Sequence, residues 1–170
     1  WEAAGSADSM KLYYSLTNDI KMDEDKQITG GTAVELTKAG DLSDELKERF
    51  RHLASLQAAG IDVNAETLRT ILKSQIVMVA YNADGDVTSA TEVQKPGVLD
   101  AVFADEDAGN AISEELGAIV EGSAATFKLW APTAQDVDLI IYDANFAEEA
   151  TVAMTENPET GIWESEAQGN

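Results

Sequence analysis

The segment TFKLWAPTAQDVDLIIYD, from Thr126 to Asp143, carries the clearest signal of the fold. TFKLWAP and VDLIIYD are short runs rich in β-branched and aromatic side chains, and a proline-containing turn separates them. Outward from this stretch, AIVEG precedes it, and TVAMTE and GIWES follow it after polar turns. Four or five short strands at this spacing predict a β-sandwich.

The predicted sandwich has too few residues to be complete. A sandwich of this kind usually takes about 100 residues, whereas Ala118 to Asn170 spans residues 118–170 only. We therefore predict an incomplete immunoglobulin-like β-sandwich over residues 117–170. An N-terminal domain over residues 1–116 precedes it, with the boundary near Leu116–Gly117. Residues from about Ala118 are therefore expected to be poorly ordered or to pair their exposed edges with something else.

The N-terminal part shows both strand and helix signals. Strands are predicted at Met10–Leu16, in TAVELT from Thr32, and at Ile76–Tyr81, where a run that is apolar on both faces predicts a central strand and a hairpin turn follows. A helix is predicted within Asp41–Gln57, and Asn64 is expected to cap a second, shorter helix. The predicted class is thus α+β to mainly β, with an antiparallel sheet and two short helices in the first domain.

Charge and composition exclude several functions. With 32 acidic and 11 basic residues the chain carries a net charge of −21, which opposes binding to nucleic acid and to anionic lipid surfaces. The chain has no cysteine, so disulfides, thiolate zinc sites and cysteine nucleophiles are excluded. The longest apolar run is far shorter than the roughly 20 residues of a membrane-spanning helix, and no signal segment is recognisable at the N-terminus.

Residues suited to catalysis or metal binding are scarce. His52 is the only histidine; it lies in the predicted helix without a serine nucleophile motif nearby, so we expect a surface or packing role. Neither acidic cluster, DEDKQITGG or DEDAGNAISEE, has the spacing of a calcium loop. We therefore predict no catalytic residue, no metal site and no cofactor, and interpret the clusters as solvated loops.

Two tryptophans are the candidate binding residues. Strand alternation in TFKLWAP puts Phe127 and Leu129 on one face and Lys128 and Trp130 on the other, opposite the expected core. A large ring on an outward face indicates a contact with a neighbouring domain, a platform for a sugar ring, or packing under a loop. Trp163 in GIWES is interpreted either as a core residue or as a second binding residue.

Two sections of the sequence resemble known families. LGAIVEGSAATFKLWAPTAQDVDLIIYD resembles the opening strands of the family 48 carbohydrate-binding module, which precedes the catalytic barrel in starch- and glycogen-debranching enzymes. Upstream, FRHL, ILKSQIVMVAYNADGDV and VQKPGVLDAVFA are similar to the N2 domain of type I pullulanases, although Arg51 replaces the usual proline of the first motif. The two similarities occur in the order that the family has them.

This resemblance implies a parent enzyme of glycoside hydrolase family 13, secreted by a bacterium to the exterior, cell surface or periplasm. Such an enzyme hydrolyses α-1,6-glucosidic branch linkages in pullulan, starch and glycogen. The barrel motifs Y-N-W-G-Y-D-P and G-x-R-x-D do not occur in this sequence, so no catalytic residue is carried over, and calcium is left open for the parent enzyme only. The implied partners are an α-glucan and the catalytic domain of the same polypeptide.

We therefore expect a non-catalytic accessory region that serves in domain packing and α-glucan contact. Two alternatives stay open, namely a stand-alone carbohydrate-binding protein and a purely structural spacer.

Overall fold

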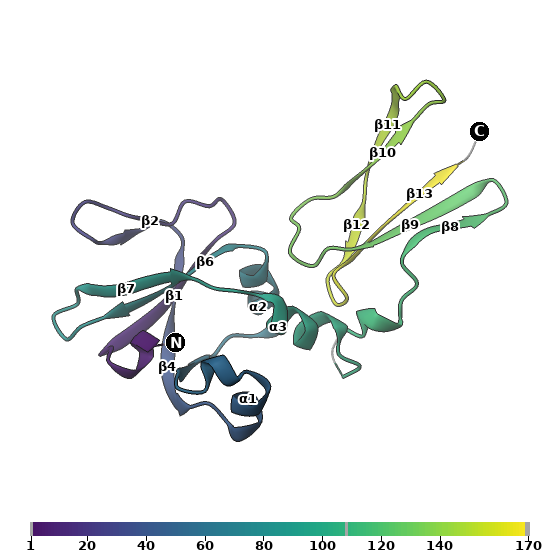
Figure 1. Ribbon diagram of the computed structural model, residues 1–170. Helices are drawn as coiled ribbons and strands as arrows, with labels where there is room; N and C mark the ends of the chain where they lie inside the picture. Colours follow the sequence, from purple (N-terminus) through teal and green to yellow (C-terminus); the bar gives the residue numbers. More distant parts are fainter. Residues whose placement is uncertain (1, 108, 169–170) are drawn as a thin grey trace. The chain divides into compact units, whose positions relative to one another are not determined.

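The computed structural model describes residues 2–107 and 109–168 (Figure 1). The chain divides into two compact units, residues 1–94 and 95–170. Antiparallel sheets with few short helices build both units. The predicted class, α+β to mainly β with an incomplete immunoglobulin-like sandwich in the second part, is confirmed.

The first unit contains a five-stranded sheet in the order β5-β4-β1-β6-β7, in which all neighbours are antiparallel. The alternation seen in TAVELT agrees with the register, since Leu36 and Val34 lie opposite Met10 and Leu12. The five strands are β1 (Ser9–Ser15), β4 (Thr32–Asp41), β5 (Gln57–Ile61), β6 (Gln75–Tyr81) and β7 (Val87–Glu92).

The core of this unit lies on one face of the sheet. Helix α2 (Ala65–Leu72) begins at the predicted cap, because the Asn64 side chain accepts a hydrogen bond from the Thr67 N–H, and its Ile71 packs against Leu12 and Ile76. At the other end of the face, the 3₁₀ turn η1 (Glu2–Gly5) contributes to a second small cluster. Burial of these apolar side chains is what holds helix to sheet.

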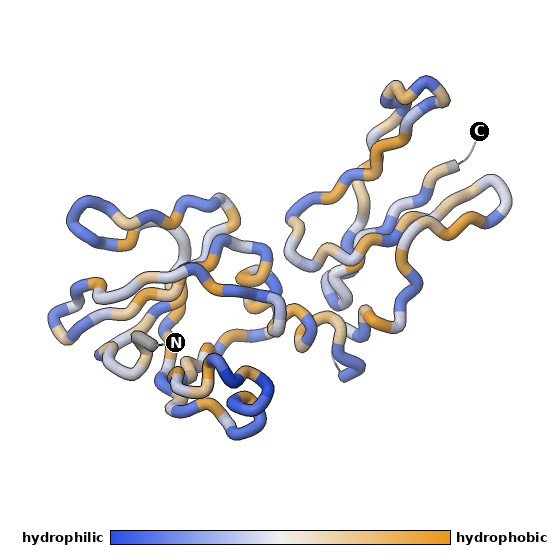
Figure 2. Tube along the Cα trace, in the orientation of Figure 1, coloured by the Kyte–Doolittle hydropathy of each residue, from blue (hydrophilic) through white to orange (hydrophobic). Residues whose placement is uncertain are grey.

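The first predicted helix is shorter than expected. Helix α1 spans Asp44–Arg49 and ends at Phe50, whose backbone leaves the helical region (φ −123°, ψ 65°). A 3₁₀ turn, η2 (Arg51–Leu53), follows, and β5 begins only at Gln57, the last residue of the predicted helix. The helical spacing of Leu53 and Leu56 in the sequence therefore does not correspond to a continued helix. Figure 2 shows hydrophilic residues along α1.

A small hairpin, β2 (Lys21–Met22) and β3 (Ile28–Thr29), emerges between β1 and β4. Hydrophilic residues dominate its tip in Figure 2.

The second unit contains two sheets. One has four antiparallel strands in the order β12-β13-β9-β8, and the other pairs β10 with β11. The strands are β8 (Gly117–Glu121), β9 (Ala124–Trp130), β10 (Asp138–Tyr142), β11 (Glu148–Ala153), β12 (Thr155–Asn157) and β13 (Ile162–Gln168).

The second unit begins with a segment of short helical turns that packs against its strands. It consists of α3 (Pro96–Leu99), a π-helical turn η3 (Asp100–Ala104) and a 3₁₀ turn η4 (Ala111–Ser113). Phe103 of η3 is completely buried, and its ring lies close to Gly161 in the turn between β12 and β13. The domain boundary that we predicted at Leu116–Gly117 stays a prediction; β8 begins at Gly117.

Candidate functional site

The two candidate tryptophans lie on neighbouring strands and hold one turn in place. Trp130 ends β9 and lies opposite Ile162 of β13, and Trp163 follows opposite Leu129. The Trp130 indole N–H donates to the Thr160 carbonyl at 2.9 Å, and the Trp163 indole N–H donates to the Ala131 carbonyl at 3.0 Å. The Trp130 indole is thus bound to the β12–β13 turn and the Trp163 indole to the residue after β9, which fixes this turn against the end of β9.

Close packing leaves little freedom in this turn. Gly161 has φ +68°, and a Cβ atom there would lie 2.4 Å from Cβ of Pro132. The Ala131 N–H donates to the Gly161 carbonyl at 3.0 Å. Only glycine fits both the backbone angle and the space.

The burial of the two faces differs from our expectation. Leu129, which we expected to face the core, exposes 49% of its surface, whereas Trp163 across from it exposes 6%. Trp130 is half-buried.

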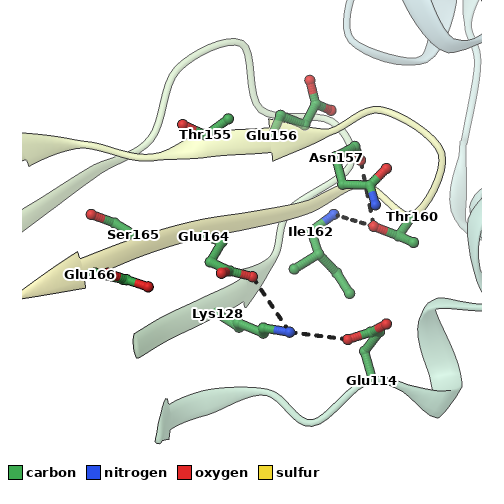
Figure 3. A pocket seen from close by; sticks show the side chains of 10 residues that line it. All are labelled: Glu114, Lys128, Thr155, Glu156, Asn157, Thr160, Ile162, Glu164, Ser165 and Glu166. Carbon is green, nitrogen blue, oxygen red and sulfur yellow. Dashed lines mark hydrogen bonds and ion pairs between the residues drawn. The ribbon is translucent and has the colours of Figure 1, made fainter. Parts of the chain in front are cut away.

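A polar groove of about 460 Å³ runs along the face of β12 and β13 (Figure 3). Lys128 of β9 lies within it, and its Nζ is 3.2 Å from Oε2 of Glu114 and 3.4 Å from Oε2 of Glu164. The pKa of Lys128 is raised, first by the hydrogen bond to Glu114 and further by Glu164. The remaining lining residues are Thr155, Glu156, Asn157, Thr160, Ile162, Ser165 and Glu166. Hydroxyl, amide and carboxylate groups can hydrogen-bond a polar ligand here, but no histidine is among the lining residues.

The β10–β11 hairpin carries exposed rings. Phe146 exposes 88% of its surface, and Tyr142, at the end of β10, exposes 57%. The Asp143 carboxylate shapes the turn by accepting hydrogen bonds from the N–H groups of Asn145 at 2.8 Å and Ala147 at 2.9 Å. These bonds, that of Ala147 first, lower the pKa of Asp143.

Phe146 has a left-handed backbone, with φ +62°. Two other hairpins have the same five-residue turn. In each, the side chain of the first turn residue accepts a hydrogen bond from the backbone N–H of the fifth, as Asp143 does from Ala147. The fourth position, which has positive φ, is Gly85 in the turn that starts at Asn82 and Lys26 in the turn that starts at Asp23. Glycine adopts this conformation freely, whereas other L-residues lose roughly 1–2 kcal/mol. Phe146 therefore has an unfavourable backbone conformation and buries almost none of its side chain. Its ring makes no net contribution to the stability of the fold.

Sequence reasoning thus found the tryptophans and missed Phe146. The available signal was DANFA, an Asp-initiated turn with an aromatic residue where glycine or asparagine is usual.

His52 lies in η2 with its ring 6.5 Å from that of Phe50 in an edge-on contact. Within residues 2–107 and 109–168, no group of three or more potential metal ligands comes together. No helix in that part of the chain has the length and apolar character needed to span a bilayer.

Two family models match the chain. The pullulanase N2 domain matches residues 1–101, and carbohydrate-binding module 48, also described as the isoamylase N-terminal domain, matches residues 115–170.

The chain is also similar to known proteins along nearly its whole length. A pullulanase of Klebsiella pneumoniae is 33% identical over 163 residues, which cover 96% of this chain and 14% of that protein. The crystal structure of apo pullulanase from the same organism matches with a TM-score of 0.85 and 33% identity, over 99% of this chain and 17% of that one. A maltotriose complex of the Klebsiella pneumoniae pullulanase gives a TM-score of 0.83 at 33% identity, over 99% of this chain and 15% of that one. The chain therefore spans about a sixth of these proteins.

Proposed function

Because this chain belongs to the pullulanase N2 domain family, we propose that it is a non-catalytic accessory region of a pullulanase-type enzyme. The whole enzyme would hydrolyse α-1,6-glucosidic branch linkages in pullulan, starch and glycogen. Support comes from the order of the two family matches, N2 before module 48. We keep residues 1–116 and 117–170 as the proposed domains and assign no catalytic residue to either.

The observation that carries a binding role is the β10–β11 hairpin. A pyranose ring has an apolar face of C–H groups that can lie against an aromatic ring, and its hydroxyl groups donate to carboxylates. Phe146 and Tyr142 supply exposed rings, and Asp143 and Glu148 supply carboxylates on the same hairpin. A neutral glucan is also compatible with the charge of −21, which opposes an anionic ligand. We therefore place the α-glucan contact on this hairpin.

Trp130 and Trp163 enter the proposal mainly as supporting residues. Both indole N–H groups are bound to backbone carbonyls, and Trp163 is buried. Trp130, which is half-buried, is proposed as a contact for another domain or as a second contact for sugar. The proposed partner domain is the catalytic domain of the same polypeptide, and the proposed location is the exterior, cell surface or periplasm of a bacterium.

Affinity electrophoresis tests the glucan contact. In native gels containing amylopectin or pullulan, the chain should migrate more slowly than in gels without polysaccharide, and Phe146→Gly should remove most of this retardation. Lys26→Gly is the matched control, since it makes the same change at the same turn position of the β2–β3 hairpin, and it should be retarded like the unaltered chain.

The alternative function is a purely structural spacer. It is favoured by the hydrogen bonds that already occupy the indole N–H groups of both tryptophans. A spacer would show no retardation in either gel, and equal retardation of all three proteins would place the contact elsewhere. Release of reducing sugar from pullulan by the pure chain would contradict the non-catalytic role.

A further inference from the structure

β8 is the outer strand of the four-stranded sheet. It pairs with β9 along one side, from Gly117 opposite Lys128 to Glu121 opposite Ala124, and among the described residues no strand pairs with its other side. Val120 exposes 70% of its surface. The strand therefore presents free backbone N–H and C=O groups next to an exposed apolar side chain.

In the part of the chain that the structure describes, this edge lacks the features that protect strand edges in other proteins, namely lysine, proline, a bulge or a covering strand. β8 has the sequence GAIVE and an uninterrupted register with β9. The other edges differ: β12 is only three residues long and is followed by Pro158, and β5 in the first unit lies against η1. The pairing of β7 with β6 and that of β10 with β11 each contain a register shift. β8 is thus the edge best suited to accept another strand.

The same edge is locally neutral in a very acidic chain. Within residues 117–127 Glu121 is the only charged side chain, although 25% of all residues are charged. Two molecules with a net charge of −21 each can approach most closely where like charges are fewest.

We propose that β8 is a self-association edge, which pairs antiparallel with β8 of a second copy of this chain about a two-fold axis at Ile119. This register places Val120 opposite Ala118 and Glu121 opposite Gly117, so that no carboxylate faces another. The two Glu121 residues are then four positions apart, about 14 Å at roughly 3.4 Å per residue. That separation exceeds the Debye length of about 8 Å at 0.15 M salt. The pairing satisfies the free backbone groups and covers both Val120 side chains.

The association should be weak. A pair of five-residue strands buries less than the roughly 1,200 Å² of the smallest stable interfaces, so we expect a dissociation constant of about 0.1–1 mM. Raising the salt concentration from about 0.05 M to about 0.5 M should strengthen it, since screening reduces repulsion between the acidic molecules.

Sedimentation equilibrium between about 20 µM and about 1 mM protein measures the association. Val120→Lys places a charge at the edge. Because Val120 is exposed, this substitution should leave the fold unchanged, which circular dichroism checks. Val98→Lys is the matched control, since Val98 is also exposed, at 41%, and lies in α3 away from the edge. Both variants lower the net negative charge equally, which by itself would favour association. We expect the unaltered chain and Val98→Lys to dimerise, and Val120→Lys to stay monomeric.

A second measurement locates the contact without depending on that variant. A nitroxide attached at Ser123→Cys, in a chain without other cysteines, should broaden the amide signals of residues 115–121 in an isotope-labelled second copy. A chain that is monomeric at about 1 mM overturns the proposal. Equal dimerisation of Val120→Lys, or broadening centred on other residues, also overturns it.

Discussion

Replacing Phe146 by glycine should remove an exposed aromatic ring while changing stability very little. The ring exposes 88% of its surface, so about 12% of a side chain that can bury roughly 200 Å² is covered, or about 25 Å². At about 25 cal/mol per Å² this burial contributes about 0.6 kcal/mol. Glycine removes the strain of the left-handed backbone, which stabilises the fold by roughly 1–2 kcal/mol. The greater freedom of glycine in the unfolded chain destabilises the fold by about 0.5–1 kcal/mol.

These contributions nearly cancel, so we expect the free energy of unfolding of Phe146→Gly to lie within about 1 kcal/mol of the unaltered chain. Urea unfolding followed by tryptophan fluorescence is a suitable assay, because Trp130 and Trp163 both lie in the second unit. Lys26→Gly, at the equivalent turn position, should leave this transition unchanged. A loss of more than about 2 kcal/mol in Phe146→Gly would mean that the ring supports the fold, and would refute the argument that it is available for a ligand.

Three further outcomes are expected. Phe103→Ala should destabilise the second unit by about 3–5 kcal/mol, seen as a lower urea midpoint of the same fluorescence transition, because the ring is completely buried. Gly161→Ala should destabilise by at least about 2 kcal/mol, since its Cβ would meet Pro132 at 2.4 Å. Gly122→Ala, with similar φ but open space, should lose only about 1 kcal/mol, and equal losses would contradict the packing argument. Asp143 has a lowered pKa in the folded hairpin, so its stabilising effect is present above the ordinary aspartate pKa and is lost as the pH falls through the folded value. Amide exchange in the hairpin, corrected for the intrinsic effect of pH, should quicken over that acidic range, and Asp143→Asn should abolish this dependence.

Sequence patterns predicted the elements whose signals are local. Asn64 was identifiable as a helix cap because the capping hydrogen bond joins residues three apart, and the alternation in TAVELT sufficed to assign its faces. The end of α1 was not predictable in this way, because the helical spacing of apolar residues continues to Leu56 in the sequence, whereas the backbone leaves the helical region at Phe50.

The same distinction applies to the site. Trp130 and Trp163 were visible as candidates, but their hydrogen bonds to the carbonyl groups of Thr160 and Ala131 depend on the β9–β13 register. Phe146 was missed because its significance lies in its backbone angle and exposure, neither of which composition reveals. Its turn chemistry, Asp143 accepting from Ala147, was a local signal that could have been used.

Titration of the isotope-labelled chain with maltoheptaose, followed by two-dimensional amide NMR, tests whether the β10–β11 hairpin contacts α-glucan without cleaving it. We expect saturable shift changes concentrated at residues 140–148, with the sugar still intact at the end of the titration. Absence of localised shifts at saturating sugar, or changes confined to the rest of the chain, would contradict the account.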